Sequence, residues 1–180
     1  MNPSLVLISG LPGTDKTKLA YELGKRLKVP VFAKDRFQSQ LRLLGLTDRE
    51  GPAGDNLLFD MADQQLSLGL GAILDAVFSK HEFRQKAHDL AERHSADFKP
   101  ILCYCSDDTV LKKRMETREQ SVPHWSPVGW DAILTIRAYF EPWNEISALH
   151  LDAVEDFQRN LSRSLDWILN NDVAQIGGMQ

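Results

Sequence analysis

Five short apolar runs, separated by segments of helical period, constrain the fold of this chain more than any other feature. Strands that are apolar along their whole length are buried on both faces, which requires helices on both sides of a parallel sheet. The expected strands are Ser4–Ser9, Val29–Ala33, Gly71–Phe78, Pro100–Cys105 and Ala148–Ala153. The sequence therefore predicts an α/β fold built on a five-stranded parallel sheet.

The segments between these runs have apolar residues at every third or fourth position, which is typical of helices. We expect helices over about Lys16–Lys28, from Asp35 through Leu44, over Asp55–Leu68, Phe83–Ala91, Ser106–Met115 and Asp131–Phe140, and from Val154 to Ile168, with Asp35 and Ser106 as N-caps. Residues 121–130 contain two prolines and a glycine and are expected to form a loop. A chain of 180 residues is long enough for one domain, 1–180.

Composition excludes several functional classes. The formal charge is −4, so we do not expect a nucleic acid or an anionic membrane surface as partner. No apolar run approaches the ~18 residues of a membrane-spanning helix, and the first residues do not resemble a signal peptide, so we expect a cytoplasmic protein. Cys103 and Cys105 are expected on one face of a strand and indicate neither a zinc site nor a disulfide framework.

The segment GLPGTDKT lies between the first expected strand and the first expected helix. It matches the phosphate-binding pattern G-x-x-x-x-G-K-[ST] at every fixed position except the sixth, where Asp15 replaces glycine. In such a loop, backbone N–H groups point at phosphate oxygens, the lysine reaches the β- and γ-phosphates, and the hydroxyl binds Mg²⁺. The expected nucleotide-binding residues are Gly10, Leu11, Pro12, Gly13, Thr14, Asp15, Lys16 and Thr17.

Asp15 raises the question of charge. A carboxylate ~4 Å from a phosphate costs ~4 kcal/mol at an effective dielectric constant of 20. That repulsion disappears if the side chain points away from the phosphates. We expect it to face them, so that the substitution Asp15→Gly tightens Mg-ATP binding at least ~tenfold.

Acidic residues follow the second and third expected strands, where ligands bind in parallel sheets. Asp35 can accept the proton of a substrate hydroxyl, or it can serve only as an N-cap. The neighbouring Arg36 can steady the acceptor. Asp75, inside an apolar run, is expected to bind Mg²⁺ or its water and to border the substrate; the alternative is a structural ion pair.

Three arginines are further candidates. Arg114 and Arg118 are four positions apart on one expected helix, beside the proline-containing loop. Such a pair suits a lid that stabilises the transferring phosphoryl group, although charged helix faces are often only solvated. Arg84 is assigned to the substrate site, with an exposed surface cation as the alternative.

Four segments, GLPGTDKT, VFAKDRF, GAILDAVFSKHEFR and CYCSDDTVLKKRMETR, together resemble the motifs of small P-loop kinases of the zeta-toxin, chloramphenicol phosphotransferase and polynucleotide-kinase type. This group includes many AAA-domain, ATP-binding kinases. The resemblance implies a three-layer P-loop NTPase fold with strand order 2-3-1-4-5 and a small lid at about 119–130. It implies ATP and Mg²⁺ as cofactors, with Thr17 and Asp75 at the metal. It also implies catalytic roles for Lys16, Asp35, Arg114 and Arg118.

The sequence thus predicts a phosphotransferase that moves the γ-phosphoryl group of Mg-ATP to a hydroxyl of a small molecule, with activity reduced by Asp15. The alternative is a nucleotide-binding protein or pseudo-kinase in which Asp15 impairs phosphate binding. A mechanical ATPase of the AAA+ type is a weaker third candidate, because the chain is short for the helical domain that such machines use.

Overall fold

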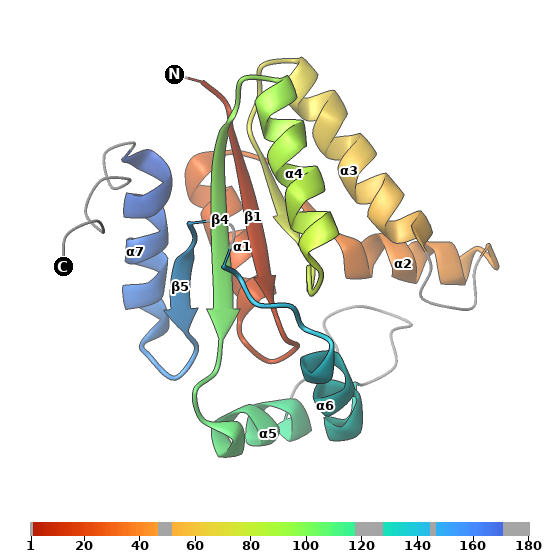
Figure 1. The fold of residues 1–180 in the computed structure, drawn as a ribbon, viewed down its shortest axis with the longest axis vertical. Coiled ribbons are helices and arrows are strands. Elements are labelled where there is room, and N and C mark those ends of the chain that lie inside the picture. The colour runs from red at the N-terminus through yellow and green to blue at the C-terminus, as the bar shows by residue number, and fades with distance from the viewer. Residues whose placement is uncertain (1, 47–51, 118–127, 145–146, 171–180) are drawn as a thin grey trace.

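The expected parallel sheet is confirmed in the computed structural model, which describes residues 2–46, 52–117, 128–144 and 147–170. Five strands lie in the order β2-β3-β1-β4-β5, and all neighbouring pairs are parallel (Figure 1). The strands are β1 (Ser4–Gly10), β2 (Val31–Ala33), β3 (Ala72–Asp75), β4 (Asp97–Tyr104) and β5 (Leu149–Asp152). The order matches the 2-3-1-4-5 topology that the resemblance implies.

Helices follow the strands and cover both faces of the sheet (Figure 1). They are α1 (Lys16–Leu27), α2 (Lys34–Leu43), α3 (Pro52–Ser67), α4 (His81–Arg93), α5 (Asp108–Thr117), α6 (Trp130–Ala138) and α7 (Phe157–Leu169). None of the helices in these described ranges is both long and apolar enough to cross a bilayer.

Alternation along β1 explains the three layers. Successive side chains of a strand point to opposite faces. Leu5 and Leu7 pack in a cluster with residues of α3 and α4, whereas Val6 and Ile8 pack in a second cluster with residues of α1 and α7. All four side chains are at most 1% exposed. The central strand is therefore buried on both faces, as its continuous apolar run predicts.

Several element boundaries differ from the expected ones. β4 begins at Asp97 rather than at residue 100, because β1 continues to pair with it back to the Ser4–Asp97 register. β2 begins only at Val31. β3 ends at Asp75 rather than continuing to residue 78, and the chain then turns toward α4. This early end brings residues 76–79 to the carboxyl edge of the sheet.

Two expected N-caps are wrong. α2 starts directly after β2 with Ala33 as its N-cap, so Asp35 lies in the first helical turn. A carboxylate there is still favoured by the positive end of the helix dipole. Before α5, Asp107 rather than Ser106 accepts hydrogen bonds from the N–H groups of Thr109 and Val110. Asp35 is therefore not needed as a cap.

Lys99 is a buried cation in the middle of β4, with only 9% of the residue exposed. Its Nζ donates to the carbonyl oxygens of Trp167 and Asn170, at 3.1 and 3.3 Å. These carbonyls belong to the C-terminal end of α7, where a positive charge is favourable. Lys99 thus fastens α7 to the sheet.

We predict that Lys99→Met lowers the free energy of unfolding by ~2 kcal/mol, because hydrogen bonds to a charged group contribute ~1.5–3 kcal/mol. The matched control is Lys25→Met, whose exposed ammonium pairs with Glu22 three residues away and, being screened by solvent, should contribute much less to stability. Urea denaturation of both variants measures the difference. Equal stability losses would contradict the capping role of Lys99.

Candidate functional site

The loop between β1 and α1 is shaped by two glycines. Gly10 has φ +150°, and a Cβ at this position would lie 2.2 Å from the carbonyl oxygen of Cys103. Gly13 has φ +87°, and a Cβ there would approach side-chain atoms of Leu111 and Met115 to 2.8 and 2.9 Å. A side chain at either position would force β4 or α5 away from the loop. The two glycines therefore allow the close approach on which the loop's shape depends.

Asp15 has a left-handed backbone conformation, with φ 62° and ψ 9°. Glycine adopts this conformation freely, and Asp and Asn are the other residues most often found in it. The carbonyl of Asp15 accepts the first hydrogen bond of α1 from Leu19 N at 2.9 Å. Its carboxylate does not cap α1. The N-terminal N–H groups of this helix are thus not used by the side chain of Asp15, and such groups bind anions well.

The carboxylate of Asp15 is bound by Arg114 of α5. Arg114 donates through Nη1 to Asp15 Oδ2 at 2.8 Å and through Nη2 to the carbonyl oxygen of Ala153 at 2.7 Å. The sequence predicts that this carboxylate faces the phosphates, and it gives no sign of the pair with Arg114 that the structure shows. The negative charge of Asp15 is largely cancelled by the adjacent guanidinium. Arg114, expected in a lid, is instead held at the phosphate loop.

Asp152, at the end of β5, extends this arrangement. Its Oδ1 accepts hydrogen bonds from Ser106 N at 3.1 Å and Val154 N at 3.0 Å. Burial opposes the charged carboxylate, but these N–H groups and nearby Arg114 outweigh that effect and hold the pKa of Asp152 below its ordinary value. Its stabilising contribution is present above the pKa of the unfolded chain and is lost as the pH falls through the lowered value.

Lys16 and Thr17 begin α1, and Asp75 ends β3 in register with Ile8 of β1. Lys16 and Asp75 are both buried, at 5% and 4% exposure. Both influence Cys103 on β4: burial raises the pKa of the thiol to about 12, Lys16 opposes that rise, and Asp75 adds to it. A hydroxyl and a carboxylate are the oxygen ligands that Mg²⁺ prefers. The side chains of Thr17 and Asp75 are of the type that binds Mg²⁺, and their role as its ligands stays a prediction.

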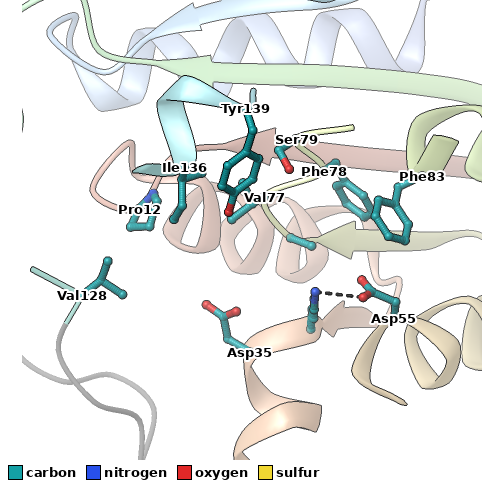
Figure 2. A pocket seen from close by; sticks show the side chains of 12 residues that line it. Pro12, Asp35, Asp55, Val77, Phe78, Ser79, Phe83, Val128, Ile136 and Tyr139 are labelled. Atoms are coloured by element: carbon teal, nitrogen blue, oxygen red, sulfur yellow. Dashed lines mark ion pairs between the residues drawn. The ribbon is translucent and has the colours of Figure 1, made fainter. Parts of the chain in front are cut away.

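A cavity of about 120 Å³ opens beside the phosphate loop (Figure 2). Pro12 of the loop and Asp35 of α2 both line it. The other apolar lining side chains include Val77, Phe78, Phe83, Ile136 and Tyr139. Figure 2 shows these groups on one side, with Asp35 and Asp55 on the other. The cavity is therefore apolar on one side and charged on the opposite side.

An ion pair, not predicted from the sequence, forms part of the charged side. Lys34 Nζ lies 2.9 Å from Asp55 Oδ2 and joins the start of α2 to the start of α3. Their side chains are 26% and 11% exposed. Asp55 was expected only as a helix start, because nothing in its local sequence indicates a partner 21 positions earlier. Asp35, next to Lys34, also faces the cavity (Figure 2).

Two of the predicted arginines, Arg36 and Arg84, do not line this cavity. Arg36 is exposed and donates to the hydroxyl of Tyr21 on α1 at 3.3 Å. Arg84 is fully buried, which corrects the alternative of a surface cation. Its guanidinium donates to the carbonyl oxygens of Phe78, Ser79, Glu141 and Pro142 and lies over the Trp143 ring. Arg118 and residues 119–127 of the lid expected at about 119–130 lie outside the described residues.

The side of the cavity formed by α6 is held by an ion pair with α5. Arg137 donates to both carboxylate oxygens of Asp108, at 2.8 and 2.7 Å. The hydrogen bonds from Arg137 hold the pKa of Asp108 below its ordinary value. This bidentate pair connects the helix that carries Ile136 and Tyr139 to the helix that carries Arg114.

Two other hollows are less suited to this chemistry. A crevice of about 10 Å³ on the Asp15 side of the loop has room for about one water molecule. A hollow of about 430 Å³ is lined by Pro3, Leu27, Asp97 and Leu169, among others. Although it is larger, it lies at the amino ends of the strands, whereas ligands of such sheets bind at the carboxyl ends. Its position at the carboxyl ends of the strands therefore favours the 120 Å³ cavity as the ligand site over the larger hollow.

The pairing of Asp15 with Arg114 predicts a non-additive result for Mg-ATP affinity. Arg114→Met should weaken binding at least ~tenfold, ~1.4 kcal/mol, because it leaves a bare carboxylate beside the phosphates. Asp15→Gly should change the affinity less than ~threefold, because it removes an already neutralised charge. The double variant should recover most of the loss.

Isothermal titration of the four proteins measures this cycle. Additive losses in the double variant would mean that Arg114 acts on the nucleotide independently of Asp15. A large gain of affinity in Asp15→Gly alone would restore the view that the carboxylate opposes the triphosphate.

Comparison with known proteins identifies a family and similar folds. The family model described as AAA domain (AAA_33) matches residues 5–143. No curated protein matches the sequence. A crystal structure from Chloroflexus aurantiacus j-10-fl, described provisionally as a kinase, superposes with a TM-score of 0.72 at 21% identity, covering 93% of this chain and 99% of that one.

Two further solved structures are similar over nearly their whole length. A sugar kinase from Janibacter sp. HTCC2649 has a TM-score of 0.70 at 20% identity, covering 92% of this chain and 94% of its own. An APS kinase from Mycobacterium tuberculosis, in complex with AMPPNP and APS, has a TM-score of 0.63 at 15% identity, covering 94% and 99%. At these identities the likeness concerns the fold alone.

Proposed function

The chain belongs to the AAA domain family, and from this membership and the geometry of the site we propose that it is an ATP-dependent phosphotransferase with a small-molecule acceptor. The donor is Mg-ATP, bound at Gly10–Thr17. The acceptor hydroxyl lies in the 120 Å³ cavity. Similar folds described as sugar kinase and APS kinase support the reaction class.

One observation carries this proposal: Pro12 and Asp35 line the same cavity. A phosphate-binding loop and a carboxylate from a different strand end thus share one small space. Phosphoryl transfer requires the acceptor oxygen next to the terminal phosphate and a group that positions it or accepts its proton. The cavity offers both on adjacent walls, whereas the crevice on the other side of the loop holds about one water.

In the proposed reaction, the acceptor oxygen attacks the γ-phosphorus and forms a new P–O bond. The bond between the γ-phosphorus and the bridging oxygen breaks, and ADP leaves with the electron pair. The carboxylate of Asp35 takes the hydroxyl proton. Lys16 offsets negative charge on the β- and γ-phosphates.

The site also offers candidate ligands for Mg²⁺. Thr17 and Asp75 would hold Mg²⁺, and their hydroxyl and carboxylate oxygens fit that ion. When bound, Mg²⁺ would supply positive charge that offsets the negative charge developing during transfer. Arg114 acts as a positioning residue that holds Asp15.

The competing function, a nucleotide-binding pseudo-kinase impaired by Asp15, has less support. It requires the carboxylate to repel the triphosphate, but the 2.8 Å pair with Arg114 neutralises it. The position of Asp35 in the cavity beside the loop fits a catalytic protein better, although the start of α2 favours a carboxylate in either case.

We predict that Asp35→Asn lowers the rate of phosphoryl transfer by 10²- to 10⁴-fold, the usual contribution of a general base. Mg-ATP affinity should change little, because Asp35 lies on α2 and not on the phosphate loop. The control is Asp60→Asn, an exposed aspartate of α3 that accepts a hydrogen bond from Gln64. It should leave the rate unchanged.

The measurement is transfer of the γ-phosphoryl group of labelled ATP to a pooled extract of small metabolites, with nucleotide binding followed separately. Full transfer by Asp35→Asn would remove the base assignment. An absence of labelled product with the unmodified protein, despite Mg-ATP binding, would instead favour the nucleotide-binding alternative.

A further inference from the structure

We propose that the phosphoryl acceptor is an uncharged, polyhydroxylated small molecule of about the size of a monosaccharide, and that the Lys34–Asp55 pair selects against charged acceptors. This inference rests on the proposed function and specifies the acceptor class of the same site. It is carried by the shape of the cavity, by its two-sided lining and by its charge balance.

The size of the cavity favours a small acceptor. Its volume of about 120 Å³ is below the ~300–1,000 Å³ of pockets for drug-sized ligands. The phosphate loop forms one wall through Pro12, so only a short acceptor can bring its hydroxyl to a phosphate there.

The lining is polar on one side and apolar on the other (Figure 2). Phe78, Phe83 and Tyr139 contribute aromatic rings from the β3–α4 segment, α4 and the end of α6. Asp35 and Asp55 lie opposite them. A ring with C–H groups on its faces and hydroxyls at its edge satisfies both sides at once. Apolar surface with a few well-placed polar groups is the usual construction of a selective small-molecule site.

The charge balance argues against an anionic acceptor. Among the lining residues that the structure describes, the charged side chains are Lys34, Asp35 and Asp55. Lys34 is bound to Asp55 at 2.9 Å, so the pair is neutral overall and Asp35 leaves a net negative charge. A carboxylate or phosphate on the acceptor would face Asp35, and among the described lining residues Lys34 is the only cation and is already paired, which is unfavourable for an anion.

A cationic acceptor is disfavoured for a different reason. An ammonium group would bind most strongly to Asp35, the carboxylate that Lys34 does not neutralise. That contact would stabilise the charged carboxylate and make it a weaker proton acceptor. Hydroxyls avoid this conflict, because one can donate to Asp55 while another accepts from Lys34. A neutral polyol therefore uses both members of the pair.

The test uses three matched sets of probes: D-glucose, D-glucuronate and D-glucosamine, and the corresponding galactose and mannose sets. With the unmodified protein and Mg-ATP, we expect at least one neutral sugar to be phosphorylated with kcat/KM at least ~tenfold above its uronate and its amino sugar. Preference for a charged member in the best set overturns the proposal. Transfer to none of the neutral sugars overturns it too.

Two variants of opposite charge separate selection from a merely structural pair. Asp55→Asn frees the ammonium of Lys34 and should raise the rate on the uronate relative to the neutral sugar by ~tenfold. Lys34→Met frees the carboxylate of Asp55 and should raise the relative rate on the amino sugar. A structural ion pair would lower all rates together and leave these ratios unchanged, which would overturn the proposal.

Asp63→Asn is the matched control. Asp63 is also an aspartate of α3, but it pairs with Arg93, the last residue of α4, and with His94 directly after it, and it does not line the cavity. Its selectivity ratios should equal those of the unmodified protein, and folding of every variant is checked by its thermal unfolding midpoint. Because each ratio compares substrates within one protein, partial unfolding of a variant does not alter it.

The acceptor class and the phosphotransferase function are disproved by different results. If the acceptor class is wrong but the function is right, label passes from ATP to a charged molecule, and Asp35→Asn abolishes that transfer. If the function itself is wrong, no small molecule is labelled in any protein, whatever its charge.

Discussion

The left-handed backbone at Asp15 is the constraint on which the site depends. The loop needs φ 62° where β1 turns into α1, and at this position the side chain leaves toward α5 rather than toward the first turn of the helix. The charge of the carboxylate is then met by Arg114, which also holds the carbonyl of Ala153 after β5. One backbone conformation thereby joins the loop to two other segments of the carboxyl edge. The exposed pair by itself stabilises the fold by only ~0.2–1 kcal/mol, so its importance lies in cancelling charge and fixing position.

The positions at which the strands end determine where the acceptor cavity lies beside the phosphate loop. β3 stops at Asp75, and the residues that follow form one wall of the acceptor cavity instead of continuing the sheet. β2 stops at Ala33, which places Lys34 and Asp35 at the same edge. Arg84 stabilises the segment after β3 by donating hydrogen bonds to the carbonyl oxygens of Phe78 and Ser79. The donor loop and the acceptor cavity are adjacent because three neighbouring strands end at nearly the same level.

Much of this arrangement could be predicted from the sequence because it is local or periodic. Apolar runs identified the strands, and spacing placed the phosphate loop between β1 and α1. The orientation of Asp15 could not be predicted, since its partner Arg114 is 99 positions away. The Lys34–Asp55 pair could not be predicted either, because nothing in the sequence between these two residues indicates that they are partners. Arg84 was misjudged because a helix position predicts exposure only when the neighbouring backbone is known, and here four carbonyls surround the guanidinium. Local pattern thus predicted where the site lies, but not how its charges are paired.

The central claim is that a phosphate loop with Asp15 at the sixth position of the pattern, where glycine is usual, still binds a triphosphate. The reason is that Arg114 of α5 offsets the charge of the Asp15 carboxylate. The most direct test is isothermal titration of the unmodified protein with Mg-ATP, with Lys16→Ala as the reference. The account predicts saturable binding at one site with Kd of about 1–100 μM and a loss of at least ~tenfold in the reference variant. Equal affinity in the two proteins, or no saturable binding up to ~1 mM, would contradict it.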